Sequence, residues 1–152
     1  QDLTGCWLID ADGKSRNVRP SAHPERGALN RIAWARYETE SYLVHPAALA
    51  RFLQARGVQD AAAAVRQFFT TRLGAELANA FYGQPFAPPQ LVENFLRTTK
   101  ARTEIIGALL QEAGVYGLDY TRFDEIAAVM LPEEIHPEVK EKLDFIQQAF
   151  GL

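Results

Sequence analysis

The hydrophobic pattern at the start of the chain predicts a short strand followed by a loop. Residues 6–9 form an uninterrupted apolar run that ends at acidic residues, as a buried strand does. Residues 10–30 are rich in Gly, Ser, Asn, Pro and charged residues, a composition typical of a loop. Residues 31–37 alternate in part between apolar and polar positions, which indicates a second short strand.

After His45-Pro46 the pattern changes to helical spacing. Proline suits the first position of a helix, and apolar residues recur at helical spacing from there until Gly57 ends the run. We expect four more helices, over residues 60–82, 89–113, 120–130 and 137–150. The first of these places a set of apolar residues on one side: Val65, Phe68, Phe69, Leu73 and Leu77.

These elements predict a mainly α fold with an uneven layout. A strand-and-loop segment over residues 1–44 precedes a helical, bundle-like region over residues 45–152. Because one or two strands do not form a stable sheet alone, we expect the chain to be the C-terminal piece of a larger protein. Aromatic residues such as Trp7 and Trp34, and the single cysteine Cys6, are expected to be buried.

Composition narrows the classes of protein to consider. The chain has 152 residues, of which 47% are hydrophobic, too many for a disordered tail. No apolar run approaches the roughly 18 residues that a membrane span needs. A single cysteine excludes a disulfide scaffold and a thiolate zinc site. With no signal-peptide pattern in the first residues, we expect a soluble cytoplasmic protein that does not enter a membrane.

The formal net charge of −3 hides an uneven distribution of charge. Residues 13–36 hold six basic residues against one acid, a balance of +5, whereas residues 119–144 hold eight acids against three bases, a balance of −5. A local basic segment can bind a polyanion even in an acidic chain. Four residues of this segment are candidates for binding nucleic acid: Lys14, Arg16, Arg19 and Arg26. A solvated basic loop is the alternative interpretation.

Two carboxylate pairs carry the candidate chemistry. Asp10 and Asp12 follow the first strand, where strand alternation would point both to one side and make a shelf for Mg²⁺ or Mn²⁺, although Asp-x-Asp-Gly is also a common turn. Glu38 and Glu40 follow the second strand and share a face only if that segment is extended. Two such pairs joined by a basic loop match the needs of metal-dependent phosphodiester cleavage.

The two motifs around these acids resemble a known family. Ile9-Asp-Ala-Asp-Gly, followed by Arg36-Tyr-Glu-Thr-Glu-Ser-Tyr-Leu-Val-His-Pro-Ala-Ala-Leu, is similar to the TOPRIM region of the overcoming-lysogenization-defect (OLD) type of ATPase-coupled nucleases. In that family an Asp-x-Asp strand is followed by an Arg-Glu-Ile-Glu-Asn-Tyr-Leu-Leu-x-Pro-Glu-Ala stretch. Thr39 here stands for the Ile, and Ser41 stands for the Asn. The helical remainder resembles the family only in outline.

The resemblance implies a Mg²⁺- or Mn²⁺-dependent DNA nuclease, of a kind found in phage defence, fused behind an ATPase domain. It makes Asp10, Asp12 and Glu40 metal ligands, Glu38 a further acid at the catalytic site, and Lys100 a catalytic lysine on a later helix, where it shares a face with Arg97. The family's first glutamate strand and Walker A motif do not occur in this sequence, so we expect this piece alone to be inactive.

Two other interpretations stay open at the sequence level. In one, the acids only form turns and caps in a non-enzymatic helical interaction or dimerisation module, in which case a homodimer is expected. In the other, the chain belongs to another class of metal-dependent phosphotransfer domain. The histidines do not separate these interpretations, because His23, His45 and His136 each precede a proline and indicate chain turns or helix starts.

Overall fold

The structure is a computed structural model that describes residues 3–14, 23–84, 87 and 89–152. It is mainly helical, with a two-stranded parallel sheet near the N-terminus, which confirms the coarse fold prediction. Strand β1 (Gly5–Ile9) pairs with β2 (Leu29–Ala33) in the register Gly5↔Leu29 to Ile9↔Ala33. The second strand therefore begins earlier than the alternation over residues 31–37 predicted.

The helices follow the strands in chain order. The α-helices are α1 (Pro46–Ala55), α2 (Ala61–Leu73), α3 (Ala75–Phe81), α4 (Gln90–Thr98), α5 (Ala108–Glu112), α6 (Asp124–Ala127) and α7 (Pro137–Phe150). Short 3₁₀ turns occupy Thr39–Leu43, Tyr120–Arg122 and Pro132–Glu134, and a π-helix spans Ala101–Gly107. The predicted helix starts at Pro46 and Pro137 are confirmed, with His45 and His136 as the N-cap residues.

Two predicted long helices are each broken. The helix expected over residues 60–82 is divided at Gly74, whose φ of 86° and ψ of 155° end α2 before α3 begins. The helix expected over residues 89–113 stops after Thr98, because Thr99 is extended with φ −108° and ψ 132°. The chain then resumes as the π-helix and continues into α5.

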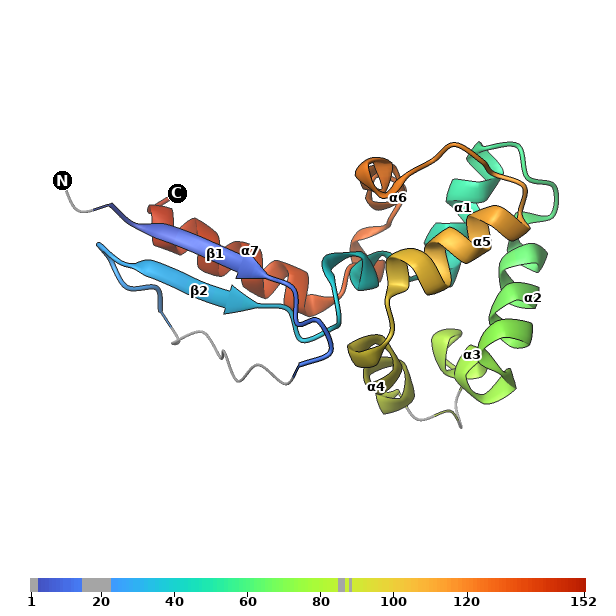
Figure 1. Cartoon of the computed structure of the whole chain (residues 1–152), viewed down its shortest axis with the longest axis horizontal. Coiled ribbons are helices and arrows are strands. Elements are labelled where there is room, and N and C mark those ends of the chain that lie inside the picture. The colour runs from blue at the N-terminus through green and yellow to red at the C-terminus, as the bar shows by residue number, and fades with distance from the viewer. Residues whose placement is uncertain (1–2, 15–22, 85–86, 88) are drawn as a thin grey trace.

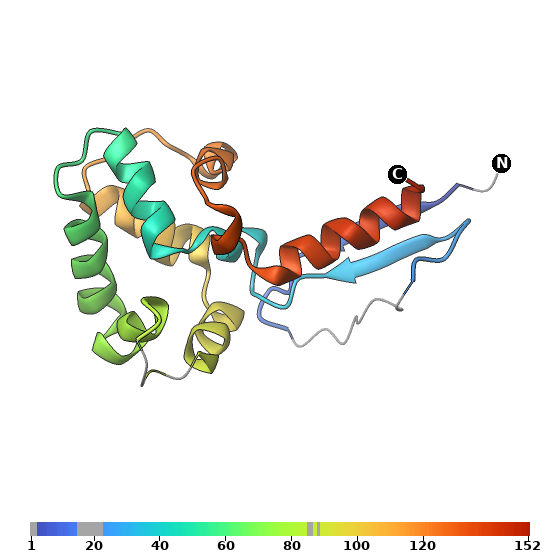
Figure 2. The same cartoon turned by 180° about the vertical axis from the view of Figure 1, so that it is seen from behind.

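The molecule is elongated, with the sheet at one end and helices α1 to α6 at the other (Figure 1). Helix α7 runs back along the sheet and packs against β1, so the last helix lies beside the first strand (Figures 1 and 2). Both strands point toward the helical end. Their carboxyl ends, where Asp10 and Trp34 follow, therefore lie at the junction of the two parts.

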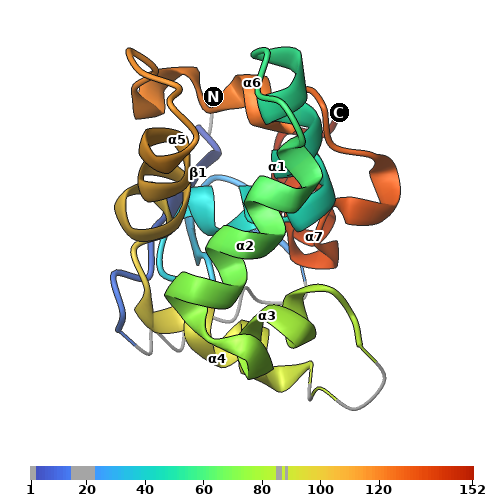
Figure 3. The same cartoon turned by 90° about the vertical axis from the view of Figure 1, so that its right-hand side faces the viewer.

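The hydrophobic core lies within the helical end. In that end α1 packs against α2, and α3 lies between α2 and α4 (Figure 3). Phe69 is fully buried at the centre, with edge-on contacts to the rings of Phe68, Phe81 and Tyr82. Trp34 is buried as predicted, but Trp7 is 50% exposed, so its expected burial is wrong. Helix α7 covers only one face of the sheet (Figures 1 and 2).

Candidate functional site

The first carboxylate of the site, Asp10, is held by Thr39, the residue between the two acids of the second pair. Asp10 directly follows β1, and its Oδ1 accepts hydrogen bonds from the backbone N and the Oγ1 of Thr39, both at 3.0 Å. Thr39 lies between Glu38 and Glu40 in the sequence. The carboxyl end of β1 and the turn after β2 therefore meet, and Asp10 is brought beside the pair Glu38 and Glu40.

Glu38 is the buried member of this group. It is the N-cap residue of the 3₁₀ turn Thr39–Leu43 and only 5% exposed, and its Oε1 accepts a hydrogen bond of 2.6 Å from the backbone N of Arg102. Burial raises the pKa of Glu38 above its usual value, and the charges of Glu40 and Asp10 raise it further. The N–H and the guanidinium of Arg102 oppose that rise.

Asp12 does not share the environment of Asp10. The strand ends at Ile9, and Asp12 lies in an exposed turn with a left-handed φ of 51°. Strand alternation therefore does not place the two carboxylates on one side, and that expectation is wrong, while the alternative of an Asp-x-Asp-Gly turn is confirmed. The backbone N of Asp12 donates to the carbonyl of Tyr37, so the turn still lies against the second acidic motif. A metal-binding role for Asp12 stays a prediction.

Two cationic residues lie at the start of the π-helix, one beside an acid of the site and one over a neighbouring tyrosine ring. The guanidinium of Arg102 lies 4.0 Å from Oε1 of Glu40 and 4.6 Å from the centre of the Tyr120 ring. Lys100 Nζ lies 5.9 Å from the centre of the Tyr37 ring, beside Glu38 in the chain. Lys100 does not share a helical face with Arg97 as expected, because the extended Thr99 separates them.

The sequence alone does not identify Arg102 as a site residue. Its backbone N reaches Glu38 because the chain breaks at Thr99 and restarts as a helix, and neither Pro nor Gly signals that break. The only indication in the sequence is the clustering of basic residues in Arg97-Thr-Thr-Lys-Ala-Arg. The structure thus adds a cation that the spacing of motifs does not predict.

The candidate nucleic-acid-binding residues differ in their surroundings. Lys14 and Arg26 are exposed in turns that flank the loop between the strands. Arg16 and Arg19 fall outside the described residues. Among the remaining basic residues of the segment, Arg36 is only 6% exposed and so does not offer its charge to solvent.

Arg36 instead ties the segment after β2 to α4 and to the 3₁₀ turn, and its neighbour Tyr42 reaches α7. Its Nη2 and Nε bind Glu93 of α4 at 2.5 Å and 3.2 Å, and its Nη1 donates to the carbonyl of Ser41. The ring of Tyr42 lies 4.8 Å from this guanidinium, and the Tyr42 hydroxyl donates to Glu138 of α7. Burial, the hydrogen bond to Glu138 and that carboxylate's charge raise the pKa of Tyr42, so it stays a neutral donor. The arginine and tyrosine of the second motif therefore build the scaffold of the site.

The acids supply the oxygen donors that Mg²⁺ and Mn²⁺ take. Among the residues that the structure describes, no three His, Cys, Asp or Glu side chains are gathered closely enough to hold a metal ion. Mg²⁺ is commonly held by one or two carboxylates, with water and substrate phosphate as the other ligands. Glu38 is buried and already accepts the Arg102 N–H, which leaves Asp10 and Glu40 as the two carboxylates of this group that would take such a role.

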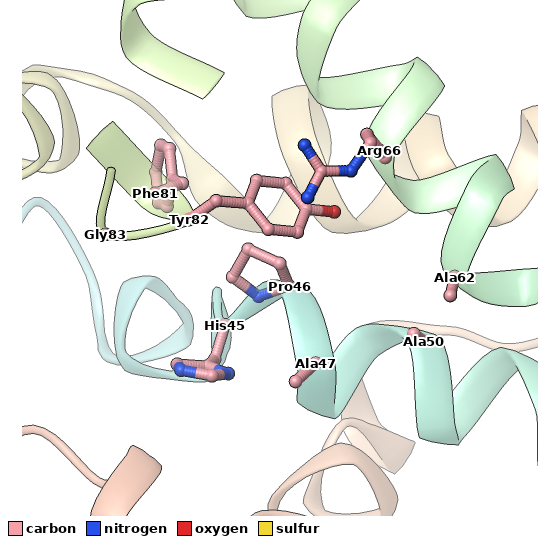
Figure 4. A pocket seen from close by; sticks show the side chains of 9 residues that line it. All are labelled: His45, Pro46, Ala47, Ala50, Ala62, Arg66, Phe81, Tyr82 and Gly83. Atoms are coloured by element: carbon pink, nitrogen blue, oxygen red, sulfur yellow. The ribbon is translucent and has the colours of Figure 1, made fainter. Parts of the chain in front are cut away.

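A separate cavity of about 500 Å³ lies between α1, α2 and the end of α3, and it contains none of the predicted acids (Figure 4). Its polar residues are Arg66, stacked 4.0 Å from the centre of the Tyr82 ring, and His45. Burial lowers the pKa of His45, and its Nδ1 lies 3.7 Å from Glu134 Oε1. These residues offer a cation and no carboxylate, so this cavity is not the acidic site.

No protein-family model matches the sequence, and no curated protein or solved structure is significantly similar to it. None of the helices in the part of the chain that the structure describes is long and apolar enough to cross a membrane.

Proposed function

We propose that this chain is the C-terminal part of a TOPRIM-type domain of the OLD-like nucleases and serves in the Mg²⁺- or Mn²⁺-dependent hydrolysis of DNA phosphodiester bonds. The observation that supports this proposal is the hydrogen bonding of the Asp10 carboxylate to Thr39, within Glu38-Thr39-Glu40. It joins the two motifs of the resemblance at the carboxyl ends of parallel strands, where open α/β sheets place their ligands.

Each residue near the junction has a role in this proposal. Asp10 and Glu40 would hold the metal, which would supply an activated water molecule and neutralise charge on the phosphate. Lys100, which lies over the Tyr37 ring, and Arg102, which lies beside Glu40, would contact the phosphate. Glu38 is a positioning residue, since its carboxylate fixes the backbone N of Arg102.

The first test is metal binding by the 152-residue chain. Titration calorimetry should show binding of Mg²⁺ and Mn²⁺ in preference to Zn²⁺, because all the ligands are oxygen atoms. Asp10→Asn and Glu40→Gln should each weaken binding by about tenfold or more. Glu141→Gln, an exposed acid on α7, is the matched control and should bind as the unaltered chain does. Equal binding by all four proteins would remove these acids from the site.

The second test concerns the gene. The resemblance predicts a strand with a glutamate and a Walker A motif upstream of this sequence. In a protein containing both, Asp10→Ala and Glu40→Ala should abolish DNA nicking while DNA binding is retained. Nicking at the unaltered rate would contradict the nuclease role of these residues.

A non-enzymatic interaction or dimerisation module is the second candidate function. It is favoured by the uncovered face of the sheet, where Trp7 is 50% exposed and Leu29 is 57% exposed. Analytical ultracentrifugation tests this second function. It would be supported if the chain formed a homodimer that Trp7→Glu dissociates, and if metal binding did not depend on Asp10.

A further inference from the structure

A second cavity opens beside the acidic site. It has a volume of about 460 Å³ and lies between the 3₁₀ turn Thr39–Leu43, the segment of residues 120–127 and the start of α7. Its volume falls within the range of small-molecule sites. Four aromatic residues and two acids line it: Trp34, Tyr42, Tyr120, Phe123, Glu40 and Asp124.

The aromatic walls of this cavity are mostly rigid. Trp34, Tyr42 and Phe123 are 4–7% exposed, and the Trp34 and Tyr42 rings are 4.6 Å apart. Tyr120 is 55% exposed and so lies toward solvent. Aromatic walls of this kind favour a flat ring, which can stack or pack edge-on against them.

The polar part of the lining selects among flat rings. A carboxylate only accepts hydrogen bonds, so Glu40 and Asp124 favour a ligand with N–H donors. Among the bases of DNA, cytosine, adenine and guanine carry an exocyclic amino group, and thymine carries a carbonyl and a methyl group instead. The lining therefore favours an amino-bearing base over thymine.

Arg102 connects the cavity to the acids. Its guanidinium lies against both Tyr120 and Glu40, and both of these residues line the cavity. A phosphate bound by Arg102 would therefore have its own base at the cavity.

We infer that this cavity holds one unstacked, amino-bearing nucleobase whose phosphate is bound by Arg102, an inference that rests on the proposed nuclease function. A base inside a duplex is stacked and paired, and removing it costs free energy. The substrate class that this site selects is therefore single-stranded or locally unpaired DNA.

Fluorescence of Trp34 provides the test. In a Trp7→Phe chain, Trp34 is the only tryptophan, and titration with dCMP in the absence of metal should change its emission saturably. The dissociation constant for dTMP should be about tenfold higher, because thymine has no exocyclic amino group and places carbonyl oxygens, which only accept hydrogen bonds, against the carboxylates. Absence of saturable binding, or equal affinity for dCMP and dTMP, would overturn the inference.

Two neighbouring alanines of the α6 segment provide matched variants. Ala127 lines the cavity, whereas Ala128 does not, and both are exposed. Ala127→Leu should fill the cavity and raise the dissociation constant for dCMP about tenfold, as expected when base stacking is blocked. Ala128→Leu should leave it unchanged. Equal effects of the two variants would contradict binding in this cavity.

A third comparison tests the role of Arg102. Arg102→Gln should weaken dCMP binding about tenfold and binding of the uncharged deoxycytidine much less, because only the nucleotide has a phosphate. Benzylamine tests for unselective capture of an aromatic amine, and binding as tight as that of dCMP would overturn a nucleobase site. If the chain binds Mg²⁺ through Asp10 but does not bind dCMP, this inference alone is overturned. If it binds dCMP but its Mg²⁺ binding does not depend on Asp10, the nuclease proposal alone is overturned.

Discussion

Glu38 lowers the stability of the folded chain at neutral pH, although the proposed function gives it a positioning role. Its carboxylate is buried, yet the negative charges of Glu40 and Asp10 act on it. A buried charge near like charges opposes folding, and the Arg102 N–H compensates only in part, since the pKa of Glu38 remains raised. Buried carboxylates with a raised pKa occur often at functional sites.

Glu38→Gln should therefore stabilise the chain at neutral pH. The amide oxygen of Gln still accepts from Arg102 N, while the buried charge is removed. Because the folded-state pKa of Glu38 is raised, its stabilising contribution is present below the unfolded pKa and is lost as pH rises through the folded value. The melting temperature of Glu38→Gln should exceed that of the unaltered chain at about pH 7, and the gap should close by about pH 4. The exposed variant Glu141→Gln is the control, and a gap that is independent of pH would refute this account.

At this scale the sequence predicts part of the site. The acids Asp10, Glu38 and Glu40 could be named because each follows an apolar segment, and the structure brings them together. The environment of Asp12 could not be predicted, because a left-handed residue in a turn overrides strand alternation. Arg102 could not be placed either, because its position depends on a helix break that is set by tertiary contacts.

At the scale of elements, helix starts are predictable and interruptions are not. Pro46 and Pro137 each follow an N-cap residue and occupy the first position of a helix. Two neighbouring residues are therefore enough to predict each helix start. At Gly74 the apolar periodicity continues from Leu73 to Leu77, and a lone glycine within such a pattern does not by itself indicate a break. The break at Thr99 has even less signal, since threonine is common in both helices and extended segments.

The π-helix Ala101–Gly107 sets the position of Arg102, and Gly107 is the residue that permits it. A Cβ at Gly107 would lie 2.9 Å from the carbonyl oxygen of Arg102. Arg102 and Gly107 lie about one π-helical turn apart, so the backbone at Gly107 approaches the carbonyl of Arg102. π-Helices occur often at functional sites.

The substitution Gly107→Ala distinguishes two effects on the free energy of unfolding, helix propensity and the close approach to the Arg102 carbonyl, because they have opposite signs. Propensity alone predicts stabilisation of about 0.5–1 kcal/mol, because alanine favours helices over glycine. We expect destabilisation of about 1–3 kcal/mol instead, since the added methyl group meets backbone that cannot move freely. Denaturant unfolding measures the sign. Ala108→Gly, the adjacent reverse change, adds no atom and should follow propensity, and stabilisation by Gly107→Ala would show that the close approach is unimportant.

At the scale of the whole molecule, α7 joins the two ends of the chain. It packs on β1, and its Glu138 accepts hydrogen bonds from the backbone N of Ala35 and from the Tyr42 hydroxyl. The boundary predicted at residue 44 stays a prediction, but in space the sheet is packed against the last helix rather than isolated at one end. The basic segment also presents less positive charge to solvent than its sequence suggests, because Arg36 is buried and paired with Glu93.

This difference in exposure predicts which cations contribute to DNA binding. Removing one cation that binds a phosphate should lower the slope of log K against log salt by about one unit. Lys14→Gln and Arg26→Gln should therefore each lower the slope by about one, because both side chains are exposed. Arg36→Gln should leave the slope unchanged, since its guanidinium faces Glu93 and Tyr42. It should lower the melting temperature, because the partly buried Glu93 loses its arginine partner. The measurement is the affinity for a single-stranded oligonucleotide at several salt concentrations, well below the melting temperature of each variant. If the slope falls for Arg36→Gln and stays constant for Lys14→Gln, DNA does not lie along the exposed turns of the basic segment. The acidic junction would then bind its substrate from another side.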